Sequence, residues 1–196
     1  MDARGGYGLA GRPSGPLGWV VGLYLRWRNA ELNAAAIDAL VPFPGERVLE
    51  VGFGPGEALR WLSTRRGIGP LAGIDPSPAM LAMAEQCNRQ AVERGAIDLR
   101  LAPIDAAPFA DRSFDAVLAV DTVQYWPNLM GDLAAVRRLL RPGGRVLFAL
   151  RGGEGGPLPA AKLRQALAAA SFVQIETERV DTRPAPSTMV IARRPM

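Results

Sequence analysis

The 196-residue sequence contains no histidine. This absence excludes histidine-based acid and base catalysis, nucleophiles activated by histidine and most zinc sites, so no metal site is expected. Cys87 is the only cysteine and cannot form an internal disulfide, which favours a reducing compartment. The longest apolar run, residues 17–25, is too short to span a bilayer, and residues 1–12 lack the apolar core of a signal peptide. These features predict a cytoplasmic protein without a transmembrane segment.

Lysine is almost as scarce, because Lys162 is the only lysine among 23 basic residues. The basic residues outnumber the 19 acidic ones and give a formal net charge of +4. They are scattered, and pairs such as Arg137-Arg138 fall at expected helix ends, where they complement carbonyl dipoles. This distribution argues against a nucleic-acid partner. The length and the 48% hydrophobic content fit a single globular domain.

The most informative stretch is RVLEVGFGPGEAL, residues 47–59. It begins as a strand buried on both faces, continues with a glycine at every second position, and ends with apolar residues at helical spacing. A strand, a tight turn and a helix are therefore expected. Glycines in the turn allow backbone conformations that a Cβ forbids, and they let a ligand lie against the chain.

Two carboxylates indicate which ligand the turn accepts. Glu50 stands at the strand end, where it repels a pyrophosphate but suits a ligand that carries an ammonium and a sulfonium. The third glycine also comes one position earlier than in the Gly-x-Gly-x-x-Gly fingerprint of dinucleotide-binding proteins. Asp75 ends a short strand expected at 71–74, about 20 residues after the turn, where an acidic residue accepts hydrogen bonds from ribose hydroxyls.

The string EVGFGPG at residues 50–56 resembles the S-adenosyl-L-methionine (AdoMet) binding loop of class I methyltransferases. Two later strings extend the resemblance: PFADRSFD at 108–115 and LLRPGGRVL at 139–147. Together they resemble the small-molecule type that includes the quinone-biosynthesis methyltransferases. The resemblance implies AdoMet as cofactor and S-adenosyl-L-homocysteine as product.

Cofactor contacts follow from the resemblance, residue by residue. They are expected from Glu50, Gly52, Phe53, Gly54, Gly56, Asp75, Pro76, Ile104 and Asp105. The acidic residue that usually contacts the adenine amino group is replaced by Pro103. Adenine recognition is therefore assigned to the Ile104 backbone, with Asp105 as a substitute for the missing carboxylate.

The resemblance also implies the fold, a three-layer α/β sandwich with a seven-stranded, mostly parallel sheet and an antiparallel last strand. The pattern predicts later strands at 97–101, 116–120, 145–150, 172–180 and 187–192, and helices at 129–140 and 160–170. Residues 45–196 form the AdoMet-binding methyltransferase domain. Residues 1–44 form an N-terminal arm and helices, with mobile segments expected at 1–16 and 152–156.

An apolar face precedes the first strand. Its members recur at helical spacing: Leu17, Val20, Leu23, Tyr24 and Trp27. Asn29 is placed to cap a second helix through residue 40. Three roles for the first helix stay open: packing on the domain, a lid over the substrate, or contact with a membrane surface.

The loop after the strand at 116–120 reads DTVQYWP and should face cofactor and substrate, because ligands bind beyond the carboxyl ends of parallel strands. It lacks the motifs of base-methylating enzymes, which favours a small or lipophilic acceptor. Asp121 and Tyr125 are the candidate bases, although direct displacement from a sulfonium needs little acid or base help. The candidate substrate pocket comprises Tyr24, Trp27, Tyr125 and Trp126, whose rings could equally serve as core packing.

Two other functions remain possible from the sequence. One is an NAD(P)-dependent oxidoreductase, which the glycine spacing, Glu50 and the lack of a tyrosine four positions before Lys162 oppose. The other is a non-catalytic, AdoMet-binding partner subunit. The expected partners are a small-molecule or lipophilic substrate and, peripherally, a membrane, and the expected state is a monomer or a homodimer.

Overall fold

The computed structural model describes residues 15–152 and 156–196, so most of the predicted arm at 1–16 and part of the loop at 152–156 lie outside the described residues. Its strands are β1 (Val48–Val51), β2 (Leu71–Asp75), β3 (Ile97–Leu101), β4 (Phe114–Val120), β5 (Leu140–Arg151), β6 (Val173–Val180) and β7 (Ser187–Arg193). Its α-helices are α1 (Gly15–Arg28), α2 (Ala30–Leu40), α3 (Glu57–Ser63), α4 (Pro78–Cys87), α5 (Arg89–Glu93), α6 (Leu129–Leu139) and α7 (Ala160–Ala169), and the short 3₁₀ turns are η1 (Ile104–Ala106) and η2 (Val123–Tyr125).

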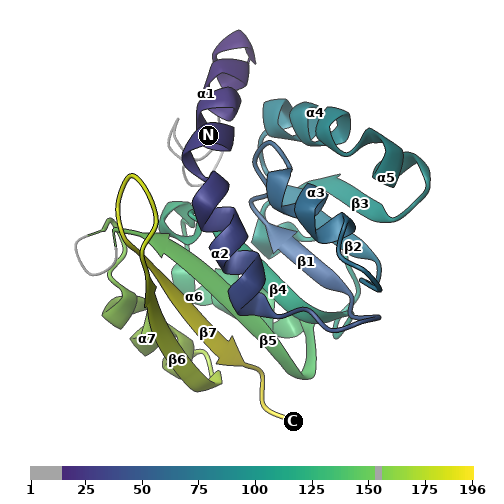
Figure 1. Ribbon diagram of the computed structural model, residues 1–196. Helices are drawn as coiled ribbons and strands as arrows, with labels where there is room; N and C mark the ends of the chain where they lie inside the picture. Colours follow the sequence, from purple (N-terminus) through teal and green to yellow (C-terminus); the bar gives the residue numbers. More distant parts are fainter. Residues whose placement is uncertain (1–14, 153–155) are drawn as a thin grey trace, which may run out of the picture.

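The strands form one sheet in the order β3-β2-β1-β4-β5-β7-β6. β7 runs antiparallel to both β5 and β6, and the pairings among β1 to β5 are parallel. Helices cover both faces of the sheet (Figure 1). The predicted three-layer sandwich with a mostly parallel, seven-stranded sheet and an antiparallel last strand is confirmed. β5 begins earlier than the expected residue 145, because Leu140 already pairs with Phe114.

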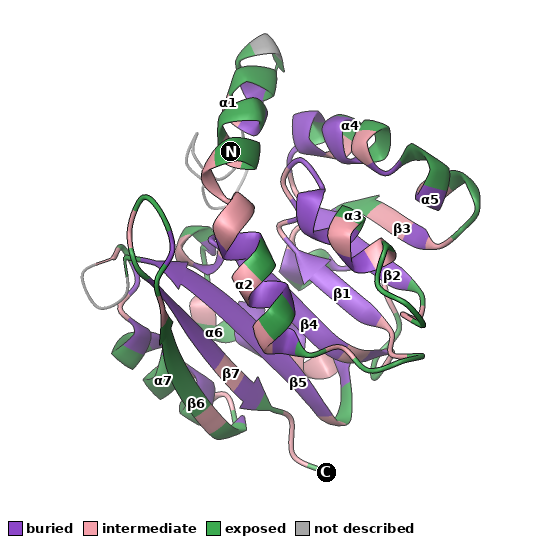
Figure 2. Ribbon diagram, in the orientation of Figure 1, coloured by how far each residue is buried: buried purple, intermediate pink, exposed green. Residues whose placement is uncertain are grey.

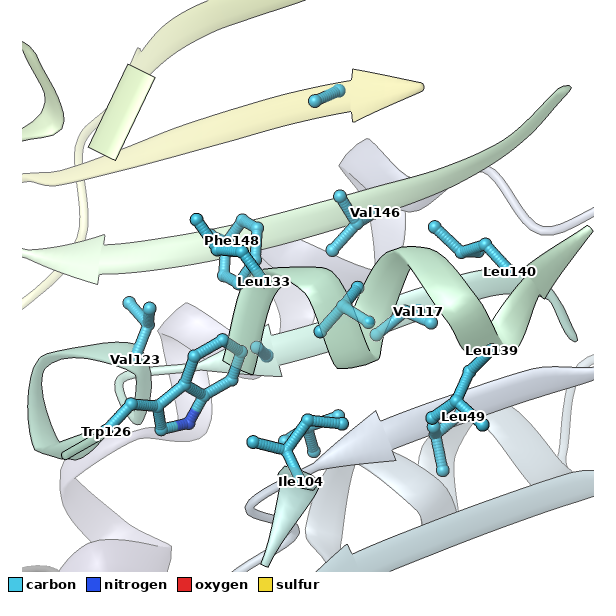
Figure 3. Packing of buried hydrophobic residues seen from close by; sticks show 14 of the residues in the cluster. Leu49, Ile104, Val117, Val123, Trp126, Leu133, Leu139, Leu140, Val146 and Phe148 are labelled. Carbon is cyan, nitrogen blue, oxygen red and sulfur yellow. The ribbon is translucent and has the colours of Figure 1, made fainter. Parts of the chain in front are cut away.

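Successive side chains of the central strands point to opposite faces of the sheet, so the hydrophobic core consists of two layers, one on each face. Leu49 and Val51 of β1 belong to the layer under α6 and α7, whereas Val48 belongs to the layer under α2, α3 and α4. All four residues of β1 are buried, as expected of a parallel strand covered on both faces (Figure 2). In the first layer Trp126 meets Phe148 of β5 edge to face, with ring centroids 5.7 Å apart (Figure 3).

Helix α2 is part of this core. Its apolar stripe of Leu32, Ala36, Ile37 and Leu40 is at most 2% exposed. Arg145 of β5 fixes the end of the helix, because its guanidinium donates to the carbonyl oxygens of Leu40 and Val41, both at 2.9 Å, and pairs with Glu46 at 2.7 Å. Helix α2 is therefore fixed to the sheet at its end as well as along its apolar stripe.

Helix α1 packs through a different face from the one that the apolar pattern marks. The marked residues are 55–74% exposed: Leu17, Val20, Leu23, Tyr24 and Trp27. The helix instead approaches α4 through Gly22, where an added Cβ would lie 2.3 Å from the Met83 sulfur. The helix therefore does pack on the domain, but through Gly22 and not through the apolar face that the pattern marks, because close glycine packing leaves no hydrophobic signal in the sequence.

Candidate active site

A pocket lies beyond the carboxyl ends of β1, β2 and β4, between these strand ends and the junction of α1 and α2. We call it the central pocket. Seven of the predicted site residues line it: Glu50, Gly52, Phe53, Gly54, Asp75, Asp121 and Tyr125. An adjoining hollow, the side pocket, shares four residues with it and is also lined by Pro76, Pro103, Ile104 and Trp126. The two hollows therefore bring together seven of the nine residues predicted to contact the cofactor.

The glycine turn forms the floor of the central pocket. Gly54 has φ +50°, and an added Cβ would meet no atom within 4 Å, so the backbone there faces open space. Gly56 has φ +84° and precedes α3, where an added Cβ would lie 2.9 Å from the Ala84 backbone of α4. Gly56 therefore has a packing role, whereas Gly54 offers bare backbone to a ligand.

Asp75 holds the turn in place. One carboxylate oxygen accepts the Gly54 amide at 2.9 Å and the other accepts the Ser77 amide at 2.8 Å. The side chain is buried, and burial raises the pKa of Asp75 to about 6, although the two amides oppose this shift. Each carboxylate oxygen has a further lone pair, so Asp75 can still accept hydrogen bonds from ligand hydroxyl groups.

Glu50 lies deeper, at the end of β1, and is 2% exposed. Burial raises the pKa of Glu50 well above its ordinary value, and the nearby Asp75 charge adds to this effect, while the Leu59 amide opposes it. Among the residues that the structure describes, its Oε2 atom is buried without a hydrogen-bond partner. An unpartnered buried carboxylate oxygen is costly, and a cationic group in the pocket would satisfy it.

The residues present therefore fit AdoMet. The open backbone at Gly54 leaves space for a flat nucleoside. The Asp75 carboxylate has lone pairs left for the nucleoside hydroxyl groups, and the unpartnered oxygen of Glu50 suits an attached ammonium or sulfonium. Across residues 15–152 and 156–196, no cluster of three or more acidic or cysteine side chains is arranged to hold a metal ion.

Asp121 stands at the end of β4 in the left-handed region, with φ +51°. Its carboxylate is 3.0 Å from Arg28 Nη1 and 3.7 Å from Arg151 Nε, and Gln124 donates an amide hydrogen to it at 2.9 Å. Arg151 also donates to the Arg28 carbonyl oxygen and to the Asn29 side chain, both at 3.0 Å. Asp121 thus joins the sheet to the junction of α1 and α2.

The other predicted site residues divide into those that line a pocket and those that do not. Tyr125 lines both pockets, and Trp126 lines the side pocket while its ring packs in the core. Tyr24 and Trp27 are 55% and 74% exposed and belong to the lining of neither pocket. The exposed Asp105 and the packed Gly56 also stand apart from both linings, so of the two residues assigned to the adenine only Ile104 lines a pocket.

Sequence reasoning missed the pocket wall that faces the sheet. This wall consists of Leu25, Arg28, Asn29 and Asn33 from the junction of α1 and α2. The acidic Glu57 was also missed, and it pairs with Arg26 of α1 at 2.5 Å and with Arg60 at 2.8 Å. A charge pattern offered one signal, because Arg26 and Arg28 interrupt the apolar helix just before Asn29. The predicted capping role of Asn29 is wrong, because its side chain makes no capping hydrogen bond and instead accepts one from Arg151.

The fold and the family match together define a class I, AdoMet-dependent methyltransferase. Residues 49–148 match the family described as "Methyltransferase domain", and the chain belongs to this family. The predicted family and cofactor are thereby confirmed.

Two curated relatives illustrate the range of the family. The chain is 29% identical over 182 residues to "Uncharacterized methyltransferase YdaC" of Bacillus subtilis, covering 90% of this chain and 98% of that protein. It is 38% identical over 122 residues to demethylmenaquinone methyltransferase of Tropheryma whipplei, covering 62% of this chain. The match spans only 46% of the length of the second relative.

Solved structures share the fold. A methyltransferase in complex with the Trm112 activator of Haloferax volcanii superposes with a TM-score of 0.76 at 21% identity, covering 89% of this chain and 94% of that one. Magnesium protoporphyrin IX methyltransferase of Synechocystis, determined with bound AdoMet, gives 0.69 at 19% identity, with 87% and 81% covered. In the described part of the chain, no helix has the length and apolar character needed to cross a membrane.

The raised pKa of Asp75 predicts a pH dependence of cofactor binding. Below pH 6 the free protein protonates Asp75, and a ligand that donates hydroxyl hydrogen bonds must displace that proton. We expect the affinity for S-adenosylhomocysteine to fall by about tenfold between pH 7.5 and pH 5, as measured by calorimetric titration.

Unfolding would not explain this loss. A carboxyl group whose pKa is raised by folding contributes more stability as the pH falls from about 6 towards its unfolded value, so protonation of Asp75 favours the folded protein. Thermal melts at both pH values serve as the control. An affinity that stays constant over this range would contradict a contact between the Asp75 carboxylate and the ligand hydroxyls.

Proposed function

We propose that this chain transfers the methyl group of AdoMet to a small or lipophilic molecule by direct displacement. The single observation that carries the proposal is the pocket floor, where open backbone at Gly54 lies beside the carboxylates of Asp75 and Glu50. This arrangement suits a cationic nucleoside better than a pyrophosphate, and therefore better than NAD.

Each floor residue has a proposed role. Gly54 lets the cofactor lie against the backbone, Asp75 accepts the ribose hydroxyls, and Glu50 faces the ammonium end. Gly52 leaves room for the Thr122 side chain, which lines both pockets. Pro76 and Ile104 line the side pocket, which we assign to the adenine. The opposite wall, at the junction of α1 and α2, is then left for the methyl acceptor.

The kind of acceptor is inferred from the walls and from the relatives. The central pocket also has apolar surface from Leu25, Phe53 and Val120, which suits an apolar molecule. One relative is named for the methylation of demethylmenaquinone, a lipophilic molecule. Because α1 exposes an apolar face, peripheral contact with a membrane remains part of the proposal, as does a monomeric or homodimeric state.

Calorimetric titration with S-adenosylhomocysteine, and with NAD as the control, tests the cofactor assignment. We expect micromolar binding of the first ligand only, and NAD binding alone would overturn the proposal. Turnover is then tested by the release of S-adenosylhomocysteine from AdoMet in the presence of phenols, quinols and apolar acids. Binding without turnover across this panel would favour a non-catalytic partner subunit.

A further inference from the structure

The central pocket has four acidic side chains in its lining, of which three are engaged by other protein groups and the fourth, Glu50, is assigned to the cofactor. Glu57 pairs with two arginines, and Asp121 pairs with two others. Asp75 accepts two backbone amides, and Glu50 is assigned to the cofactor ammonium. Since the chain contains no histidine, this lining offers neither an imidazole nor an uncommitted carboxylate that could remove a proton from an acceptor, and Tyr125 remains a neutral hydroxyl at neutral pH.

The same pocket does present a cation. The Arg28 side chain lines the wall at the junction of α1 and α2 and keeps 24% of its surface exposed. Among the described residues, Asp121 is its only ion-pair partner, through one nitrogen at 3.0 Å. A guanidinium carries five N–H donors, so most of the hydrogen-bonding capacity of Arg28 remains for a ligand.

Asp121 can release Arg28 without becoming an isolated buried charge. Arg151 lies 3.7 Å from the same carboxylate, and Gln124 donates a hydrogen bond to its other oxygen. These partners stay in place if Arg28 turns towards an incoming anion. The ion pair between Arg28 and Asp121 in the free protein is therefore one in which an acidic ligand can take the place of Asp121.

We propose that the methyl acceptor binds as an anion, an oxygen acid such as a carboxylic acid, enol or acidic phenol, whose deprotonated oxygen pairs with Arg28. This inference rests on the function proposed above. The acceptor gives its proton to water before it binds. Its oxygen then forms the new bond to the methyl carbon, the carbon–sulfur bond breaks, and the electron pair remains on sulfur as a neutral thioether. The step needs no enzyme base.

Asp121 then acts as a positioning residue and not as a catalytic base. It orients Arg28 in the free protein and competes with the acceptor for the guanidinium. The proposal consequently revises the role that the sequence suggested for Asp121, and it leaves Tyr125 as a hydroxyl that can donate a hydrogen bond to the bound oxygen.

Binding of two matched probes tests this proposal in protein saturated with S-adenosylhomocysteine. The probes are 2-naphthoate and its neutral counterpart 2-naphthylmethanol, which differ in charge but little in size. We expect wild type to bind naphthoate at least about tenfold more tightly, and Arg28→Gln to lose this preference. Arg26→Gln is the control, because Arg26 is on the same helix and has one ion pair with Glu57 but does not line the pocket.

The Asp121→Asn variant provides a second readout. Removing the competing carboxylate should raise naphthoate affinity several-fold when Arg28 is present and should have little effect in Arg28→Gln, whereas a carboxylate that acts only by repelling the probe would give the same gain in both backgrounds. Equal binding of the two probes, no binding of naphthoate, or a preference that survives in Arg28→Gln would each overturn the proposal. Failure of wild type to bind S-adenosylhomocysteine would instead overturn the proposed function, and the inference with it.

Discussion

Replacing Asp75 with alanine is expected to weaken S-adenosylhomocysteine binding by at least about a hundredfold. Two ribose hydroxyls would lose a charged acceptor, and each such hydrogen bond contributes roughly 1.5–3 kcal/mol. The Gly54 and Ser77 amides would also lose the carboxylate that now holds the turn. Calorimetric titration of the purified variant at pH 7.5 measures the effect directly.

A neighbouring carboxylate supplies the control. Asp98 lies on β3, the strand next to β2, and pairs with Arg100 at 2.7 Å at the surface, outside the lining of both pockets. Asp98→Ala should therefore bind S-adenosylhomocysteine as wild type does. If Asp75→Ala kept an affinity within threefold of wild type, Asp75 would have no direct contact with the cofactor.

Gly54→Ala is expected to cause a loss of similar size for a different reason. The new methyl group would project into the open space over the turn, where the cofactor is proposed to lie. The protein itself should still fold, because nothing within 4 Å obstructs the methyl group and the strain at φ +50° costs only about 1 kcal/mol. We expect binding to weaken by about a hundredfold or more while the melting temperature falls by a few degrees.

Gly45→Ala separates backbone strain from lost binding. Gly45 has φ +79°, also has no atom within 4 Å of an added Cβ, and lies between α2 and β1, away from the pocket lining. Its variant should show a similar fall in melting temperature with unchanged affinity. The proposed position of the cofactor would be refuted if the two alanine variants bound S-adenosylhomocysteine equally well.

Local patterns explain why the cofactor side was predictable. A buried strand, a glycine turn and a helix follow one another within thirteen residues, and each carries its own signal in the sequence. The carboxyl ends of parallel neighbours meet at one edge of the sheet, so the end of β2 necessarily brings Asp75 near the turn. The hydrogen bond between Asp75 and Gly54 realises this expectation.

The acceptor side depends on contacts that no local pattern encodes. Arg151 and Asn29 are 122 positions apart and meet only because β5 ends beneath the junction of α1 and α2. The roles of the aromatic residues could not be predicted for another reason, because pockets and cores both favour large apolar rings. The Trp126 ring belongs to the core, where it packs against Phe148 of β5. Tyr24 and Trp27 followed helical spacing, which does not distinguish a buried face from an exposed one.

The two walls of the central pocket come from separate stretches of the chain. The floor belongs to loops that follow β1, β2 and β4, whereas the opposite wall belongs to one short helix junction that precedes the whole sheet. Substitutions in that junction can therefore reshape the wall without changing the backbone of the turn after β1. If the junction binds the acceptor and the turn binds the methyl donor, as proposed, the acceptor can change in evolution while the donor stays the same.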